Sequence, residues 1–306
     1  MDKEVLDFYR MAGRITAETL GIARRRVADG YPLLELAEEM EGYMRSRGAF
    51  PAFPVNISID DAAAHFTPAS DCDIVFRRGQ IAKIDCGACY SGYIGDSAIT
   101  IEVGSNSSVA LVNSSKRALE VAIKEAKGGI SAGDLGEVIE REINALGFQP
   151  IENLSGHEVS EYDLHAGISI PNIADSGTPE IEEGMVIAVE PFATEGRGYV
   201  IERENGNIYQ FVGEKNVHND GARSLMHAIK GSRALSSLPF CERWCMSMAS
   251  GLGLNDQEMK KALKMLEKSR VIWNYPVLRE ATGSLVSQWE HTLYIKEEGC
   301  EVLTSQ

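Results

Sequence analysis

The sequence predicts one α+β domain with a helical insertion. Segments with helical spacing alternate with strand-rich blocks along the 306-residue chain. Strand-rich material lies on both sides of a helical stretch in the last third, and no internal repeat or low-complexity tract is present. We therefore expect a main domain formed by residues 1–218 and 271–306, with residues 219–270 inserted as a helical subdomain.

Two helices are predicted at the N-terminal end. Apolar residues recur at helical spacing over residues 2–28, and a second such pattern covers residues 33–47 and stops at Gly48. A proline-rich loop around Phe53 follows. Residues 80–103 then place isoleucines among glycines and small polar residues, which is typical of short strands joined by a hairpin.

Helices resume in the middle of the chain, over residues 107–127 and 132–146, and glycine closes each of them. A strand-rich block then covers residues 151–211. The inserted segment is helical again, and Asn255 with Glu258 three residues later predicts an N-cap pair inside it. Strand patterns return over residues 277–303.

Charge and composition limit the partners and the compartment. The chain has 30 Lys and Arg against 45 Asp and Glu, and its net charge of −15 argues against binding nucleic acid. The one basic cluster, Arg24–Arg26, is interpreted as a solvated helix face. No apolar run approaches the roughly 20 residues of a membrane span, and the charged N-terminus does not resemble a signal peptide. We expect a cytoplasmic protein with its six cysteines reduced.

The cysteine spacing raises a redox or zinc hypothesis that little else supports. Cys86 and Cys89 form a C-x-x-C pair, but no second pair and no paired histidines complete a four-ligand set. Cys241 and Cys245 lie four residues apart in a helical pattern, so we expect them to pack as small apolar groups.

Four carboxylates lie where an apolar strand does not ordinarily hold them. Asp85 and Asp96 stand on the two arms of the predicted hairpin, and a turn centred on Tyr90–Ser91 would make them direct cross-strand partners. Like charges in such a pair destabilise a sheet unless a cation or a shared proton compensates them. Glu190 closes an apolar run, and Glu290 interrupts another strand pattern.

With His157, the set becomes four carboxylates and one imidazole. Each acid alone is explained at least as well by an exposed edge or a salt bridge, and the four together favour a metal site. Four carboxylate charges balance two divalent cations, and mixed oxygen and nitrogen donors suit manganese, iron, cobalt or zinc. Two such ions could hold a bridging hydroxide as a nucleophile. The sequence contains neither a nucleophile elbow nor a phosphate-binding loop.

These five residues, in this order and context, resemble the metal ligands of the methionine aminopeptidase family. The matching stretches extend over most of the chain and are Lys83–Gly87, Gly92–Asp96, Ser155–His157, Ala188–Thr194 and Gln288–Thr292. The helical stretch between Glu190 and Glu290 resembles the insertion that separates type II members from type I. The short N-terminal region is similar to that of archaeal members.

The resemblance implies the pita-bread fold, a curved antiparallel sheet backed by helices. It implies that Asp85 chelates one divalent metal, that His157 and Glu190 bind a second, and that Asp96 and Glu290 bridge both. Glu190 would also carry a proton between the attacking water and the leaving amine. Cobalt, manganese, iron and zinc are all candidates for the two ions.

The same resemblance implies two catalytic histidines and an apolar pocket. His65 and His165 correspond to substrate histidines that would hydrogen-bond the substrate carbonyl and stabilise the oxyanion. Phe53, Leu164 and Tyr275 match positions of the pocket that receives the methionine side chain, which should be apolar and aromatic.

The implied activity is removal of the initiator methionine from nascent polypeptides that have a free N-terminus and a small second residue. The nucleophile would be a metal-bridging hydroxide that attacks the peptide carbonyl. One alternative is a proline-specific aminopeptidase, prolidase or creatinase-like hydrolase on the same fold, although the contexts of Phe53 and His65 favour methionine specificity. The other is a relative without metals that binds a ribosome or RNA.

Several properties stay open at the level of sequence. The physiological metal, docking on a ribosome and the preference for the second residue cannot be read from the residues, and nothing demands more than a monomer. The roles of Cys86 and Cys89 and of Met226, which falls near a variable position of the insertion, are also left open.

Overall fold

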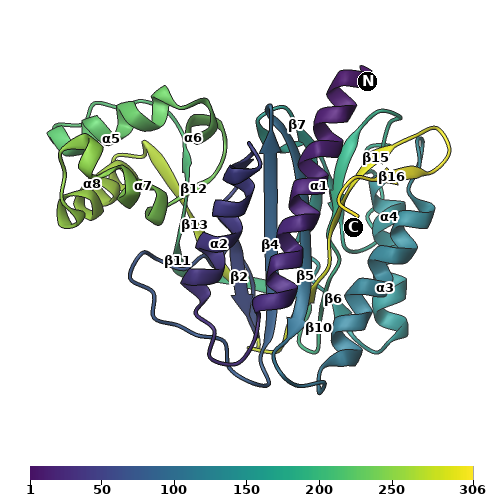
Figure 1. The fold of residues 1–306 in the computed structure, drawn as a ribbon. Coiled ribbons are helices and arrows are strands. Elements are labelled where there is room, and N and C mark those ends of the chain that lie inside the picture. The colour runs from purple at the N-terminus through teal and green to yellow at the C-terminus, as the bar shows by residue number, and fades with distance from the viewer. Residues whose placement is uncertain (306) are drawn as a thin grey trace.

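The computed structural model describes residues 1–305 and consists of antiparallel sheets backed by helices (Figure 1). The helices are α1 (Lys3–Arg26), α2 (Leu33–Ser46), α3 (Val109–Glu125), α4 (Ala132–Ala145), α5 (Asp220–Gly231), α6 (Arg233–Ser237), α7 (Glu242–Met248), the 3-10 turn η1 (Ser250–Leu252) and α8 (Asp256–Lys268). The four helices predicted before residue 150 are confirmed to within two residues at each end.

The strands form four sheets, with orders β1-β4-β2 (β5 pairing β4), β14-β10-β6, β12-β11-β13-β3 and β16-β15-β9-β7-β8. Their bounds are β1 (Phe50–Pro51), β2 (Asn56–Ile59), β3 (Ala62–Ala64), β4 (Ile81–Tyr90), β5 (Tyr93–Glu102), β6 (Gln149–Pro150), β7 (Ser155–Ser160), β8 (Asp163–Pro171), β9 (Val186–Val189), β10 (Phe192–Thr194), β11 (Val200–Phe211), β12 (Phe240–Cys241), β13 (Ile272–Glu280), β14 (Val286–Gln288), β15 (His291–Ile295) and β16 (Cys300–Val302).

Helix α1 packs directly on the long β4–β5 hairpin (Figure 1). The approach is close because both surfaces carry glycine: a Cβ atom on Gly95 of β5 would lie 2.5 Å from the backbone nitrogen of Gly13 in α1. Thr16 of α1 adds two hydrogen bonds, since its Oγ1 donates to the Gly95 carbonyl (2.7 Å) and accepts from the Ala88 amide (3.0 Å). This contact fixes the hairpin next to Asp96.

The register of the hairpin differs from the expected one by two residues. The turn centres on Ser91–Gly92, so that Asp85 faces Ala98 and Asp96 faces Gly87. Both turn residues have positive φ, +52° and +95°, which is the conformation of a type I′ hairpin. The prediction of direct cross-strand partners was therefore wrong: the two aspartates lie on one face as diagonal neighbours.

The hairpin is joined to the C-terminal strands by hydroxyl groups. Two hydroxyls of β5 donate to carbonyls of the facing segment: Thr100 Oγ1 to Gln288 (2.7 Å) and Ser97 Oγ to Glu290 (2.6 Å). In the other direction, Thr292 Oγ1 of β15 donates to the Asp96 carbonyl (2.7 Å). These bonds align residues 288–292 with residues 96–100. They bring Glu290 alongside Asp96.

Helices α5 to α8 form a lobe beside the sheets (Figure 1), and their buried apolar residues make a separate core. Asn255 and Glu258 form the predicted capping box at the start of α8. The segment is not wholly helical, because the short strand β12 pairs with β11. Strand β13 also begins at Ile272, five residues before the expected start, since its first residues pair with the end of β11. The domain boundaries themselves stay a prediction.

The cysteines are free and buried or partly buried. Cys86 and Cys89 lie an odd number of residues apart on β4 and belong to two different core clusters, so they form neither a disulfide nor a pair of metal ligands. Cys241 and Cys245 pack in the core of the lobe, as expected. Arg24–Arg26 are exposed. No helix within residues 1–305 is long and apolar enough to cross a membrane.

A buried ion pair anchors the lobe to α2. The Arg243 guanidinium donates to both carboxylate oxygens of Glu41 at 2.9 Å, and the Trp244 indole donates to Glu41 Oε2 at 2.6 Å. Glu41 also accepts a hydrogen bond from the backbone amide of Val55 (3.2 Å), in the loop before β2. One carboxylate thus connects α2, α7 and the start of a central strand.

We expect Arg243→Met to destabilise the protein by about 3–5 kcal/mol, because Glu41 would keep a buried charge without its partner. The double variant Glu41→Gln/Arg243→Met should recover more than half of this loss, since glutamine is neutral and can still accept from Val55 or Trp244. Urea unfolding of the metal-free proteins measures both values. A single variant as stable as wild type, or a double variant less stable than the single one, would contradict this account.

Candidate active site

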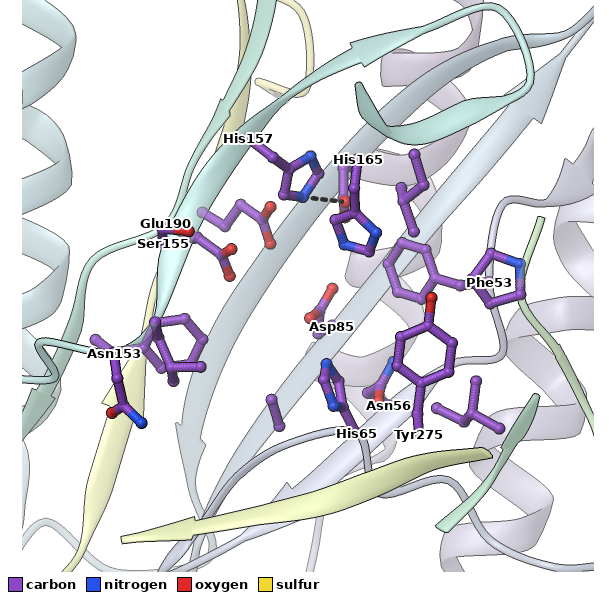
Figure 2. A pocket seen from close by; sticks show the side chains of 18 residues that line it. Phe53, Asn56, His65, Asp85, Asn153, Ser155, His157, His165, Glu190 and Tyr275 are labelled. Carbon is purple, nitrogen blue, oxygen red and sulfur yellow. Dashed lines mark ion pairs between the residues drawn. The ribbon is translucent and has the colours of Figure 1, made fainter. Parts of the chain in front are cut away.

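All ten residues that the sequence singled out line one cavity of about 310 Å³ (Figure 2). They come from segments as far apart in the chain as Phe53 and Glu290. The polar members, here named the acid–histidine cluster, are Asp85, Asp96, His157, Glu190 and Glu290. The predicted apolar members are Phe53, Leu164 and Tyr275, and His65 and His165 complete the set. A cavity of this size is in the range that holds one small ligand.

Five different segments supply the acid–histidine cluster. Asp85 lies on β4 and Asp96 on β5, and His157 lies on β7. Glu190 follows the last residue of β9 directly, and Glu290 lies between β14 and β15. The cluster therefore forms only when both halves of the chain have folded against each other.

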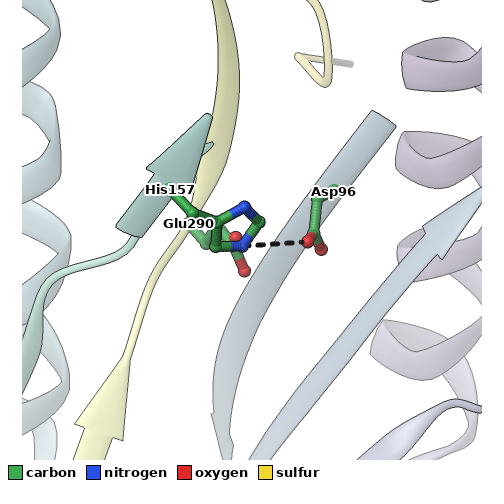
Figure 3. Close-up of side chains that lie close together, drawn as sticks. All are labelled: Asp96, His157 and Glu290. Carbon is green, nitrogen blue, oxygen red and sulfur yellow. Dashed lines mark ion pairs between the residues drawn. The ribbon is translucent and has the colours of Figure 1, made fainter. Parts of the chain in front are cut away.

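Three members of the cluster are close enough to share one ion (Figure 3). One donor atom from each of Asp96, His157 and Glu290 lies within 4.8 Å of the others, and His157 Nε2 is 3.7 Å from Asp96 Oδ2. The other two acids are linked through Gln288. Its Nε2 donates to Glu190 Oε2 (3.2 Å) and to Asp85 Oδ2 (3.4 Å).

The electrostatics of the cluster favour a bound cation. Burial raises the pKa of Asp85 to about 7, and it raises the pKa of Asp96, Glu190 and Glu290 well above the usual range, with repulsion from neighbouring acids adding to the effect. Asp85 Oδ1 and Asp96 Oδ1 are buried and have no hydrogen-bond partner within the described chain. Such carboxylates keep their charge only beside a cation and otherwise bind protons, so these residues fit a metal.

His157 is held in the form that binds metals. Its Nδ1 lies 3.3 Å from the Glu158 carbonyl, which can only accept, so Nδ1 carries the proton. The lone pair of Nε2 then points toward Asp96 (Figure 3). Burial, together with the nearby His165, lowers the pKa of His157 to about 3, and the ring is neutral as a ligand must be.

His65 is fixed by its backbone and by one hydrogen bond. It follows β3 with φ of +66°, a left-handed conformation that is uncommon outside glycine. Its Nδ1 donates to the Pro276 carbonyl (3.2 Å), and burial lowers its pKa to about 4. The neutral ring therefore presents Nε2 as an acceptor. The oxyanion role that the resemblance implies for His65 would need a donor at Nε2, and it stays a prediction.

His165 lies on β8 with its ring edge-on to His157, the ring centroids being 4.6 Å apart. Burial lowers its pKa as well. Figure 2 shows His65 and His165 on either side of Asp85 in this view. Both histidines line the same cavity as the acid–histidine cluster.

The apolar wall of the cavity is larger than predicted. Besides Phe53, Leu164 and Tyr275, the cavity is lined by five apolar residues that the sequence did not indicate: Ala64, Leu154, Phe192, Ile208 and Pro239. Pro239 belongs to the lobe, between α6 and β12. Met226 does not line the cavity, because it is buried in α5 within the core of the lobe.

Polar residues around the site were also not predicted, among them Gln288 and Asn56. Gln288 lies two residues before Glu290 on a strand pattern, so the period of two could have placed both on one face. Asn56 lines the cavity because β2 pairs with β4 and sets Asn56 opposite Asp85. That register depends on long-range pairing and leaves no local pattern in the sequence.

The site agrees with the comparisons with known proteins. The family model for metallopeptidase family M24 matches residues 7–224. The chain is 42% identical over 294 residues to the methionine aminopeptidase of Pyrococcus abyssi, covering 96% of this chain and 97% of the relative. It is 39% identical over 308 residues to that of Archaeoglobus fulgidus, with 99% and 100% covered.

A solved structure supports the fold. The methionine aminopeptidase of Thermotoga maritima aligns with a TM-score of 0.72, covering 100% of this chain and 98% of that chain at 23% identity. This confirms the predicted pita-bread fold. The relatives match nearly the whole length of the chain, and its cavity is rich in carboxylates. The chain therefore belongs to the methionine aminopeptidase family of the M24 metallopeptidases.

Proposed function

We propose that this protein removes the N-terminal methionine from polypeptides. One observation carries the proposal: a single cavity combines the acid–histidine cluster with an apolar, partly aromatic wall. The wall suits an unbranched thioether side chain, and the cluster lies where the backbone of that residue would be. The activity of the relatives named above supports the same substrate.

We propose two divalent ions, manganese, iron, cobalt or zinc, as cofactors. Asp85, Asp96, His157, Glu190 and Glu290 would hold them, as the unpaired oxygens and the free lone pair of His157 support. When bound, such ions polarise a carbonyl and lower the pKa of water toward neutrality. The mixed donor set matches all four metals.

The residues around the cluster have separate tasks in this proposal. Gln288 engages Glu190 at Oε2, so we assign Oε1 of Glu190 as the atom that carries a proton from the attacking water to the leaving amine. His65 Nε2 accepts the N–H of the scissile peptide bond, because its tautomer leaves it no proton to donate. His165 then remains for the carbonyl oxygen.

We also propose the substrate preference, the cellular compartment, the oligomeric state and the domain bounds. The substrates are nascent chains with a small second residue, since that residue lies next to the cluster. The protein acts in the cytoplasm as a monomer, and residues 219–270 form an insertion in a catalytic domain of residues 1–218 and 271–306. Pro239 supports a part of the insertion in the substrate pocket.

Metal-loaded protein should release methionine from Met-Ala-Ser and leave both N-acetyl-Met-Ala-Ser and an Ala-Pro peptide intact. The acetyl group blocks the free amine, and a proline peptide offers no side chain suited to the apolar wall. Chromatography of the products measures all three reactions. Turnover of the proline peptide without release of methionine would move the function to the prolidase type.

Glu290→Gln should weaken metal binding at least about tenfold and reduce activity with it, because one charged donor is lost from the cluster. Calorimetric titration of metal-free protein with manganese measures affinity and stoichiometry, with two ions per chain expected for wild type. Glu298→Gln, at a carboxylate that is 84% exposed, is the matched control. Unchanged affinity and stoichiometry in Glu290→Gln would remove this residue from the site.

His65→Asn should lower kcat/KM by about 10²-fold or more and leave manganese binding unchanged, because His65 contacts substrate and not metal. Asparagine tolerates positive φ, so the backbone should keep its shape. Peptide hydrolysis and calorimetry are the measurements, and His227→Asn, at a side chain that is 64% exposed, is the control. If metal binding fell together with the rate, His65 would be a ligand instead.

A further inference from the structure

Asn56 lines the cavity and carries a hydrogen-bond acceptor without a partner among the described residues. The residue is 5% exposed, and its Nδ2 donates to the Pro54 carbonyl at 3.1 Å. This bond fixes which way the amide is turned, and Oδ1 is left buried without a partner among residues 1–305. A buried acceptor that stays unpaired destabilises a protein, so a donor from outside the chain would be favourable here.

Asp85, the neighbour of Asn56, indicates which kind of donor would bind here. Asn56 and Asp85 are direct cross-strand partners, so their side chains share one face of the sheet, and both line the cavity (Figure 2). Asp85 Oδ1 is also buried and unpaired. In the proposed function Asp85 would hold a metal, so the group beside Asn56 should suit both an acceptor and a metal. A primary amine does, because it has N–H bonds to donate to Asn56 and a lone pair for the metal.

The chemistry of the proposed substrate leaves one group for this position. The thioether of methionine has no hydrogen to donate. The N–H of the scissile bond is directed to His65, whose Nε2 is an acceptor. The remaining donor on the first residue is the free α-amino group. We propose that Asn56 Oδ1 accepts a hydrogen bond from this amino group beside Asp85, an inference that rests on the proposed function and adds a residue that recognises the free N-terminus.

An amide suits this position better than a further acid. Four carboxylates already repel one another in the cluster, and a fifth would add charge and compete for the cations. The carbonyl of Asn56 adds only an acceptor. It can therefore select the amine without changing the charge on the metal site.

The test compares two ligands that differ only in the amine, L-methioninol and 4-(methylsulfanyl)butan-1-ol. Calorimetry with manganese-loaded protein gives the affinity for each ligand, and the ratio of the two affinities measures what the amino group contributes to binding. In Asn56→Leu, which has a similar volume and no acceptor, methioninol should bind about tenfold more weakly. The affinity for the alcohol without the amine should change by less than about threefold, because it makes no hydrogen bond to Asn56.

Ser58→Ala is the matched control. Ser58 lies on the same face of β2, and its buried hydroxyl is also unpaired within the described chain, but it does not line the cavity. Both affinities should stay as in wild type. Asn56→Ala also removes the acceptor without adding charge and should weaken methioninol more than the alcohol, which keeps the test decisive if Asn56→Leu folds poorly.

The outcomes separate this inference from the proposed function. Equal weakening of both ligands in Asn56→Leu, or an unchanged ratio, would overturn the role of Asn56 while methionine release by wild type still stood. If wild type bound neither ligand and released no methionine, the proposed function itself would fail. Loss of discrimination in Asn56→Leu alone supports the contact with the amine.

Discussion

The site depends on the repulsion among four carboxylates, two of them buried (Asp96 and Glu290) and two half-buried (Asp85 and Glu190). Asp85, Asp96, Glu190 and Glu290 approach one another in a cavity where burial alone disfavours their charged forms. Contacts that do not involve these carboxylates hold the segments together, chiefly the hydroxyl bonds between residues 96–100 and 288–292. The repulsion between these carboxylates destabilises the folded state, and bound divalent cations would remove it. Metal affinity is therefore coupled to the stability of the folded state.

The sequence predicted the helices, the strand-rich blocks and the identity of the cluster, because acids inside apolar strands are anomalous even without a structure. It did not predict the pairing of Asp85 and Asp96, because the turn conformation at Ser91–Gly92 decides the register, and the expected turn at Tyr90–Ser91 lies one residue earlier. The tautomer of His65 was also beyond sequence, since the carbonyl that fixes it belongs to Pro276, far along the chain.

Hydrogen bonds to Glu41 connect the lobe to the loop that precedes β2 at the cavity. Its carboxylate holds Arg243 and Trp244 of the lobe and accepts the amide of Val55, the residue before Asn56. The lobe also places Pro239 on the apolar wall. A change in how the lobe docks would therefore shift the wall and the start of β2 together. The lobe thus contacts the cavity although it carries no member of the acid–histidine cluster.

The two parts of the cavity differ in how freely they can vary. The protonation of each member of the acid–histidine cluster depends on the charges of the others. Replacing one member therefore changes the net charge of the cluster and its affinity for cations. The apolar wall comes from separate segments, including β11, β13 and the lobe. Phe53 and Leu164 belong to one apolar cluster and Phe192 to another. Asn56 lies at the boundary, neutral like the wall yet polar like the cluster. A residue of that kind can tune recognition of the N-terminus while the metal chemistry stays intact.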